Sequence, residues 1–201
     1  MDELGQTLLA QATAYTTLEI VAVVCAVLYL VFAIRQNIVC WLFAGISTAI
    51  FVYVFVVARL YMESALNVFY FAMAIYGFLV WRRGTIESPL PVTTWPIRWH
   101  AAALAAIAGL SLLSGYLLDT RTDADYAYVD SATTWASIWA TLLVARKVFE
   151  NWWYWLVIDA VMLVVFWLKG LEFTALLYVV YLVLIPVGIV QWRRSMRLQL
   201  A

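Results

Sequence analysis

The stretch RQNIVCWLFAGISTAIFVYVFVVARLYMESALNVFYFAMAIYGFLVWRR, residues 35–83, decides the fold because it recurs 111 positions later in the same chain. The second copy is residues 146–194, and the two copies align without a gap. The alignment matches Arg35 with Arg146, Trp41 with Trp152, Tyr70 with Tyr181, Gly77 with Gly188, and the Trp-Arg-Arg end at 81–83 with that at 192–194. Shared apolar composition does not readily produce these matches at one fixed offset, so the chain contains two copies of one structural unit.

Apolar residues dominate the chain to a degree that soluble domains do not reach. Of its 201 residues 67% are hydrophobic and 12% are charged, with a mean hydropathy of +0.93, whereas a soluble domain carries about a quarter charged residues. The apolar runs are long enough to cross a hydrocarbon core of about 30 Å. We expect helices, because backbone polar groups must be paired within each span. The predicted spans are Leu18–Ile34, Val39–Ala58, Ser64–Trp81, Ile97–Leu118, Val129–Ala145, Trp152–Leu168 and Leu171–Gln191.

Each repeat contains three of these spans, and one span lies between the repeats. Because three is odd, a second copy joined directly would be inverted, and the single fourth span restores its direction. We therefore predict an all-α membrane protein of seven transmembrane helices, built as two parallel three-helix repeats joined by a linker helix; such repeats occur in transporters, with the substrate near the midplane between the halves. The expected domains are an N-terminal extracytoplasmic segment (1–17), a first three-helix bundle (18–83), a linker with the fourth transmembrane helix (84–128, helix 97–118), a second three-helix bundle (129–194) and a cytoplasmic tail (195–201).

The distribution of charge predicts the orientation and excludes some partners. Nine Lys and Arg residues lie at one end of the predicted spans and three, Arg59, Arg121 and Lys169, at the other. The positive-inside rule places the nine in the cytoplasm, so we expect an inner-membrane protein with its N-terminus outside and its C-terminus inside. A formal net charge of zero gives no field that would attract nucleic acid. The two cysteines have no metal-ligand spacing, and we expect neither a metal nor a cofactor.

A stripe on the sixth span is the strongest candidate for a binding site. Trp152, Trp155 and Asp159 are spaced i, i+3 and i+7, which places them on one helical face. A carboxylate near the middle of a span costs roughly 2.5–3.5 kcal/mol, so it usually has a functional role. The bland alternatives are that Asp159 bonds a hydroxyl on a neighbouring helix and that Trp152 belongs to an interfacial aromatic belt. In the repeat, Trp41 is equivalent to Trp152 and Thr48 is equivalent to Asp159, so the predicted site is acidic in the second half only.

Further polar side chains lie on the spans that flank this stripe. The fifth span carries Thr134 and Ser137, the seventh carries Tyr178 and Tyr181, and the third carries Asn67 and Tyr70. These groups could line a pathway for a polar substrate. Helix packing is an equally common role for the hydroxyl residues, and core packing is the commoner role for the tyrosines.

Two motifs in the second half resemble those of the PnuC nicotinamide riboside transporters. They are ARKxxENWxxW at residues 145–155 and KGLxxTALLYxxYL at residues 169–182, and the resemblance covers roughly residues 17–194. It implies two three-helix bundles joined by a linker helix, as in the related SWEET sugar transporters. It also implies facilitated uptake of nicotinamide riboside, trapping by a cytoplasmic kinase, a homotrimer, and substrate binding by Asn151, Trp152, Trp155 and Asn67. The chain departs from the family at Asp159, where Asn is frequent, and thiamine or riboflavin are the alternative substrates.

Two other classes of protein fit the sequence less well. A retinal-binding seven-helix protein needs a lysine deep within a helix, whereas Lys147 and Lys169 both lie at span ends. An intramembrane enzyme needs a partner for acid–base chemistry with Asp159, and the spans supply none. We therefore expect a transporter and no enzymatic activity.

Overall fold

The computed structural model describes residues 17–57, 61–84, 90–122 and 125–199. Almost all of the predicted extracytoplasmic segment, residues 1–16, and the end of the predicted tail lie outside this part of the chain. Within the described ranges the protein is all-helical, and its helices are α2 (Thr17–Ile34), α3 (Val39–Val57), α4 (Tyr61–Trp81), α5 (Ile97–Arg121), α6 (Ala127–Ala145), α7 (Asn151–Leu168) and α8 (Glu172–Gln199). Seven helices in this order confirm the predicted fold class.

The observed helices follow the predicted spans closely, with one clear difference. Helix α8 continues to Gln199, eight residues beyond the predicted span, because Arg193, Arg194 and Arg197 favour helix and no glycine or proline interrupts them. Six of the described helices are long and apolar enough to cross a membrane. The seventh, α6, is more polar, since it carries Asp130 and several Ser and Thr residues, and it is also the helix with the largest set of buried residues.

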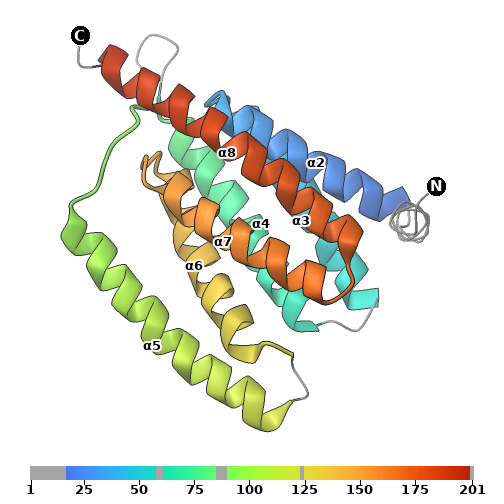
Figure 1. The fold of residues 1–201 in the computed structure, drawn as a ribbon. Helices are drawn as coiled ribbons and strands as arrows, with labels where there is room; N and C mark the ends of the chain where they lie inside the picture. Colours follow the sequence, from blue (N-terminus) through green and yellow to red (C-terminus); the bar gives the residue numbers. More distant parts are fainter. Residues whose placement is uncertain (1–16, 58–60, 85–89, 123–124, 200–201) are drawn as a thin grey trace.

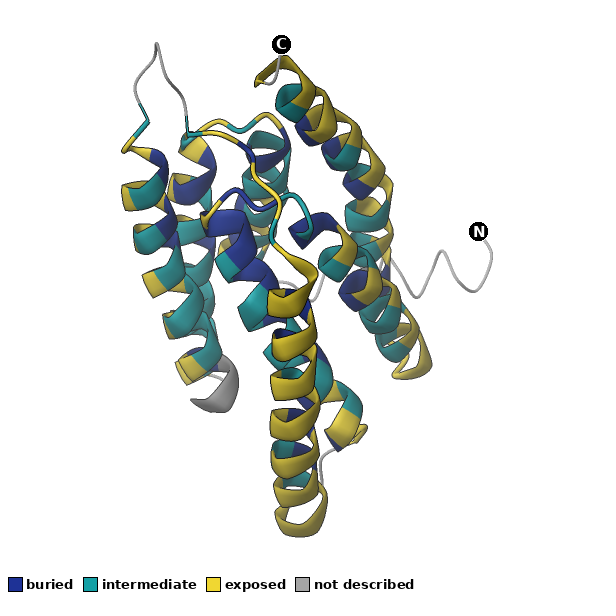
Figure 2. Cartoon of the chain, turned by 90° about the vertical axis from the view of Figure 1, so that its left-hand side faces the viewer, coloured by how far each residue is buried: buried dark blue, intermediate teal, exposed yellow. Residues whose placement is uncertain are grey.

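Six of the helices form a closed ring, and α5 lies outside it. Each neighbouring pair in the order α2, α3, α4, α6, α7, α8 is in contact, and α8 returns to contact α2. The offset of 111 residues aligns α2 with α6, α3 with α7 and α4 with α8. The contacts within the ring are therefore the same in both repeats. The linker helix α5 packs mainly on α6 and stands at the edge of the bundle in Figure 1. Its His100 side chain also reaches α7, where Nδ1 lies at hydrogen-bond distance, 3.0 Å, from the Tyr154 hydroxyl. The surface of α5 is mostly exposed, as Figure 2 shows.

The repeat is reproduced in backbone detail where α2 and α6 end. Gln36 and Lys147, which are repeat mates, both adopt a left-handed conformation with φ of 54° and 51°. At each turn the backbone N–H of the left-handed residue bonds the carbonyl three residues back, at 2.9 Å, and the next N–H bonds the carbonyl five residues back, also at 2.9 Å. This is the Schellman ending, which usually has glycine at the left-handed position.

Four tryptophans form the core at the end of the bundle where Arg35, Arg82, Arg146 and Arg193 lie, which we call the Arg-rich end. Trp41 meets Trp81 edge to face at 5.5 Å, and their mates Trp152 and Trp192 meet in the same way at 5.4 Å. The Trp81 and Trp192 rings are 6.4 Å apart and join the two pairs across the repeats. All four side chains are buried, and edge-to-face indole pairs add about 0.5–1.5 kcal/mol each to the burial of their surface.

Glycine is required where two of these indoles cross a neighbouring helix. A Cβ atom on Gly77 would overlap the Trp41 ring, and a Cβ atom on Gly188 would overlap the Trp152 ring. The helix backbone therefore approaches each indole closely only because no side chain intervenes. This explains why glycine recurs in both copies of the repeat.

We predict that Gly188→Ala destabilises the protein by about 1–3 kcal/mol, the usual cost of overpacking a filled core. Thermal unfolding of the purified protein in detergent measures this effect. The matched control is Gly109→Ala on α5, where a Cβ atom meets nothing within 4 Å, and which we expect to be neutral or stabilising. Equal melting temperatures for the two variants would contradict the packing role of Gly188.

Candidate functional site

Helix α7 carries the three residues of the predicted stripe, at increasing depth from the Arg-rich end. Trp152 lies in its first turn and is buried, Trp155 is half-buried and packs against the tryptophan core, and Asp159 is the ninth of its eighteen residues. Asp159 is only 5% exposed. Its carboxylate therefore lies inside the bundle near mid-span and not on the lipid-facing side.

Trp152 and its mate Trp41 are held tightly in this conformation. Each ring lies against a glycine and meets a second indole edge-on, as described above. Their Nε1 atoms are nevertheless buried without a hydrogen-bond partner in the described part of the chain, and so is Oδ1 of Asn151. Asn151 Nδ2 bonds the Val148 carbonyl at 2.7 Å. The two indoles join helices together here, and their predicted stacking on a substrate stays a prediction.

Asp159 has a polar neighbour on α8. Its carboxyl group interacts electrostatically with the Tyr181 hydroxyl, and the Tyr181 ring meets the Tyr178 ring edge to face at 5.7 Å. Tyr178 also stacks on Phe166 at 5.3 Å. Asp159, Tyr178 and Tyr181, which were predicted separately, therefore form one group between α7 and α8.

The equivalent positions in the first repeat carry neutral groups. Thr48, the mate of Asp159, donates its hydroxyl to the Ala44 carbonyl of its own helix at 2.8 Å. Tyr70, the repeat mate of Tyr181, interacts electrostatically with Tyr29. Tyr29 was not among the predicted site residues, and its ring lies 5.8 Å from the Trp41 ring. Asn67 and Tyr70 are half-buried on α4. The site is therefore asymmetric, with a carboxyl group in the second repeat and a neutral hydroxyl at the equivalent position of the first.

Thr134 and Ser137 lie on α6, the first helix of the second repeat, which contacts α4 of the first repeat. Ser137 is 8% exposed, and Thr134 is half-buried. The Thr141 hydroxyl donates to the Ser137 carbonyl at 2.7 Å, which is the back-bonding usual for such residues in helices. No described contact joins Thr134 or Ser137 to Asp159.

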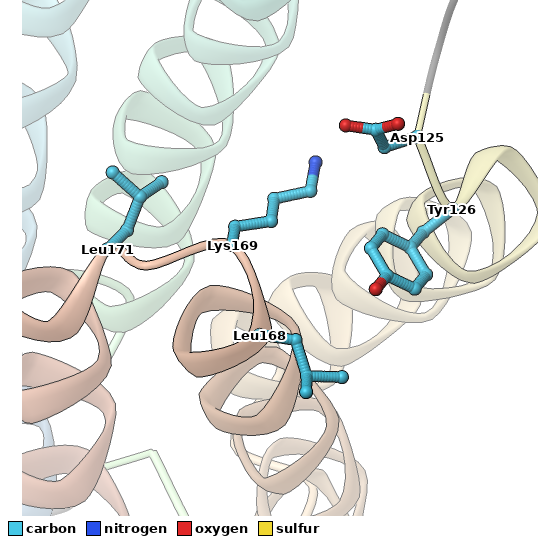
Figure 3. Close-up of a pocket in the computed structure, with 5 residues that line it drawn as sticks. All are labelled: Asp125, Tyr126, Leu168, Lys169 and Leu171. Carbon is cyan, nitrogen blue, oxygen red and sulfur yellow. The ribbon is translucent and has the colours of Figure 1, made fainter.

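Two surface pockets lie away from this group. One has a volume of about 580 Å³ and is lined by Asp125, Tyr126, Leu168, Lys169 and Leu171, where Lys169 extends toward Asp125 in Figure 3. The other, of about 350 Å³, is wholly apolar and lies between α4, α5 and α6. Within the described residues no three His, Cys, Asp or Glu side chains come together as metal ligands.

Lys147 is a buried cation at the Arg-rich end, and its burial was not predicted from the sequence. Its side chain is 4% exposed, its Nζ donates to the Leu90 carbonyl at 3.1 Å and to Gln36 Oε1 at 3.4 Å, and it lies 4.6 Å from the centre of the Trp81 ring. Burial lowers the pKa of the Lys147 ammonium to about 8 from its usual 10.5, against a smaller opposing effect of the Cys40 thiol. Its place in the ARKxxENWxxW motif and its equivalence to Gln36 in the repeat were the available signals.

Comparison with known proteins identifies the relatives of the chain. The family model described as "Nicotinamide mononucleotide transporter" matches residues 16–194. A protein of Escherichia coli (strain K12) named nicotinamide riboside transporter PnuC is 26% identical, over 90% of this chain and 86% of that protein. A protein of the same name from Neisseria mucosa is 27% identical, over 88% of this chain and 72% of its own length. The crystal structure of the vitamin B3 transporter PnuC superposes with a TM-score of 0.71 at 24% identity, covering 97% of this chain and 90% of that one.

The lowered pKa of Lys147 predicts how stability changes with pH. Between about pH 8 and pH 10.5 the unfolded chain binds a proton at Lys147 that the folded chain does not, so stability rises with pH through this window. Below about pH 8 both states are protonated, and the full cost of burying the ammonium is present. The melting temperature of the wild type relative to Lys147→Gln should therefore increase from pH 8 to pH 10. Lys169→Gln, which changes an exposed lysine at the opposite end, should leave the slope of the wild type intact, and parallel curves for all three proteins would contradict the assignment.

Proposed function

Because the chain belongs to the nicotinamide mononucleotide transporter family, we propose that it carries nicotinamide riboside across the inner membrane by facilitated diffusion. The family is a family of transporters, and the relatives from Escherichia coli and Neisseria mucosa are named for this substrate. In the proposed cycle the two repeats rock about the site between them, which then faces each side of the membrane in turn.

The buried carboxylate of Asp159 is the observation that carries this proposal. The nicotinamide ring of the riboside bears a positive charge, and Asp159 is a carboxyl group buried inside the bundle near mid-span. A cation that enters the site would offset the cost of the buried charge. Trp155 lies one turn away on the same helix face, and an indole attracts a cation to its ring face. Tyr178 and Tyr181 would offer hydroxyl groups to the ribose.

The charge distribution favours the riboside over the mononucleotide named in the family description. A phosphate group needs Arg or Lys for tight recognition. The eleven Lys and Arg residues in the described ranges lie in the turns or toward the helix ends, and the acidic Asp159 would repel a phosphate. Uptake would then be made irreversible by phosphorylation of the riboside in the cytoplasm.

The charge distribution and the exposed helix α5 bear on the orientation and the assembly of the protein. The Arg-rich end carries nine of the twelve cationic residues, which supports a cytoplasmic location for it, an outer N-terminus and an inner C-terminus. The exposed surface of α5 and the family relationship are compatible with a homotrimer. Crosslinking of the protein in membranes would measure its subunit number.

We predict that Asp159→Ala lowers uptake of radiolabelled nicotinamide riboside into proteoliposomes by about tenfold or more, since loss of one partner of a buried charge pair costs roughly 2–5 kcal/mol. Asp159→Ala combined with Trp155→Ala should abolish uptake. The matched control is Asp130→Ala, the same substitution at an exposed position in the first turn of α6, which should transport like the wild type. Undiminished uptake by the double variant would refute the site.

We further predict that nicotinamide riboside raises the melting temperature of the purified protein, because a ligand at 100 times its Kd stabilises the folded state by about 2.7 kcal/mol. Nicotinamide mononucleotide should give no shift at equal concentration, and Asp159→Ala should lose the response to the riboside. Thiamine and riboflavin are the competing ligands in this measurement. A shift with either of them and none with the riboside would assign the chain to a different vitamin.

A further inference from the structure

The two Schellman turns described above meet each other at the centre of the Arg-rich end. Gln36 ends α2 in the first repeat, Lys147 ends α6 in the second, and the Lys147 ammonium donates to the Gln36 amide oxygen at 3.4 Å. Glycine is the ordinary residue at both positions, because the left-handed conformation has a steric cost for a residue with a side chain. Neither repeat uses glycine here, which indicates that the two side chains have a role that outweighs this cost.

Lys147 is surrounded by neutral acceptors and has no carboxylate partner among the described residues. Its three neighbours are the Leu90 carbonyl, the Gln36 amide and the face of Trp81. A buried ammonium without a counter-ion is weakly held, because the cost of removing it from water is only partly offset by such contacts. The interaction is therefore strong enough to join the repeats and weak enough to be broken in each cycle.

The segment 90–95, which we call the strap, crosses the same end of the bundle on its way from α4 to α5. Its Thr93 N–H bonds the Lys147 carbonyl at 3.0 Å, and the Phe149 N–H bonds the Thr93 carbonyl at 2.8 Å. Val92 of the strap and Val148 of the turn are both buried. Lys147 thus fastens the strap through its backbone and, at Leu90, through its ammonium.

Other contacts between the repeats gather at this end. Trp81 Nε1 donates to the Ala145 carbonyl at 3.1 Å, and its mate Trp192 donates to the Ala33 carbonyl at 3.0 Å. Arg146 Nε donates to the Tyr76 hydroxyl at 3.0 Å. Together with the buried tryptophan core, these bonds close the Arg-rich end in this conformation.

We propose that Lys147, bonded to Gln36 and to the strap, is the latch of a gate at the Arg-rich end that must open for the substrate to leave. This inference rests on the proposed transport cycle, in which the two repeats separate at one end and then at the other. Separation of α2 from α6 at this end breaks the Lys147–Gln36 bond, and the strap follows the turn to which it is fastened. Lys147 acts here as a positioning residue that sets how easily the end opens.

The chain contains its own reporter for the latch, the thiol of Cys40. Cys40 is completely buried at the start of α3, and it is close enough to Lys147 to influence its charge. Its alkylation by a water-soluble maleimide, followed by mass spectrometry, requires the Arg-rich end to open. Cys25, in the middle of α2, reports unfolding of the whole bundle in the same sample.

Lys147→Met keeps an apolar stem of similar size and removes the ammonium. We expect this variant to alkylate Cys40 about tenfold more slowly than the wild type, because the closed end no longer carries the cost of burying the ammonium and opens less readily. The rate at Cys25 should be unchanged, and so should both rates in Lys169→Met, the matched control at the opposite end. An unchanged or faster Cys40 rate in Lys147→Met would overturn the latch, and an equal change at both cysteines would overturn it in favour of a purely structural lysine.

A second experiment connects the latch to transport. In a Cys25→Ala/Cys40→Ala background, Gln36→Cys and Lys147→Cys are joined by a reducible bifunctional methanethiosulfonate reagent. We expect crosslinking to lower riboside uptake at least about tenfold and reductant to restore it, because the closed end can no longer separate. Full uptake by the crosslinked protein would contradict the gate. Absence of uptake by the wild type would instead refute the proposed substrate, while the Cys40 rates would still decide the latch.

Discussion

The close approach of two indoles to two helix backbones is the constraint on which the rest of the structure depends. Trp152 can cross α8 only at Gly188, and Trp41 can cross α4 only at Gly77. These two contacts set the distance between the second and third helices of each repeat. Because the same indoles meet Trp81 and Trp192, they also set the junction between the repeats. The position of Asp159, two turns further along α7, follows from how this first turn of the helix is held.

The scaffold is nearly symmetric, whereas its polar groups are not. The repeat preserves the tryptophans, the glycines, and the left-handed turns at Gln36 and Lys147. It places Thr48 opposite Asp159, Asn67 opposite Tyr178, and a neutral amide opposite the ammonium of Lys147. Symmetric packing suits a pair of bundles that must rock against each other, and asymmetric polarity suits a substrate with one charged end. The two requirements are compatible because packing and recognition use different residues of the same helices.

The positions of the helices could be predicted well, and the roles of individual side chains could not. Apolar runs are limited by the thickness of the membrane and by turns such as Lys169–Gly170, so the observed helices begin and end close to the predicted residues. The stripe of Trp152, Trp155 and Asp159 was located correctly on one face of α7, but spacing alone does not say what that face meets. At Trp152 it meets Gly188 and Trp192, and at Asp159 it interacts with Tyr181 of α8. Lys147 was not predicted because a lysine in a turn is ordinarily exposed to water.

By itself the sequence determined the seven spans, the duplication and the placement of a carboxylate within a helix, because hydropathy, a fixed repeat offset and helical periodicity are all local properties of the chain. Only the tertiary structure decided which helices close the ring, that α5 stands outside it, and that Lys147 is buried against Gln36, Leu90 and Trp81. These features depend on contacts between residues as far as 159 positions apart. Such contacts are selected by how well surfaces pack and by which polar groups find partners, and neither is encoded in any single stretch of the chain.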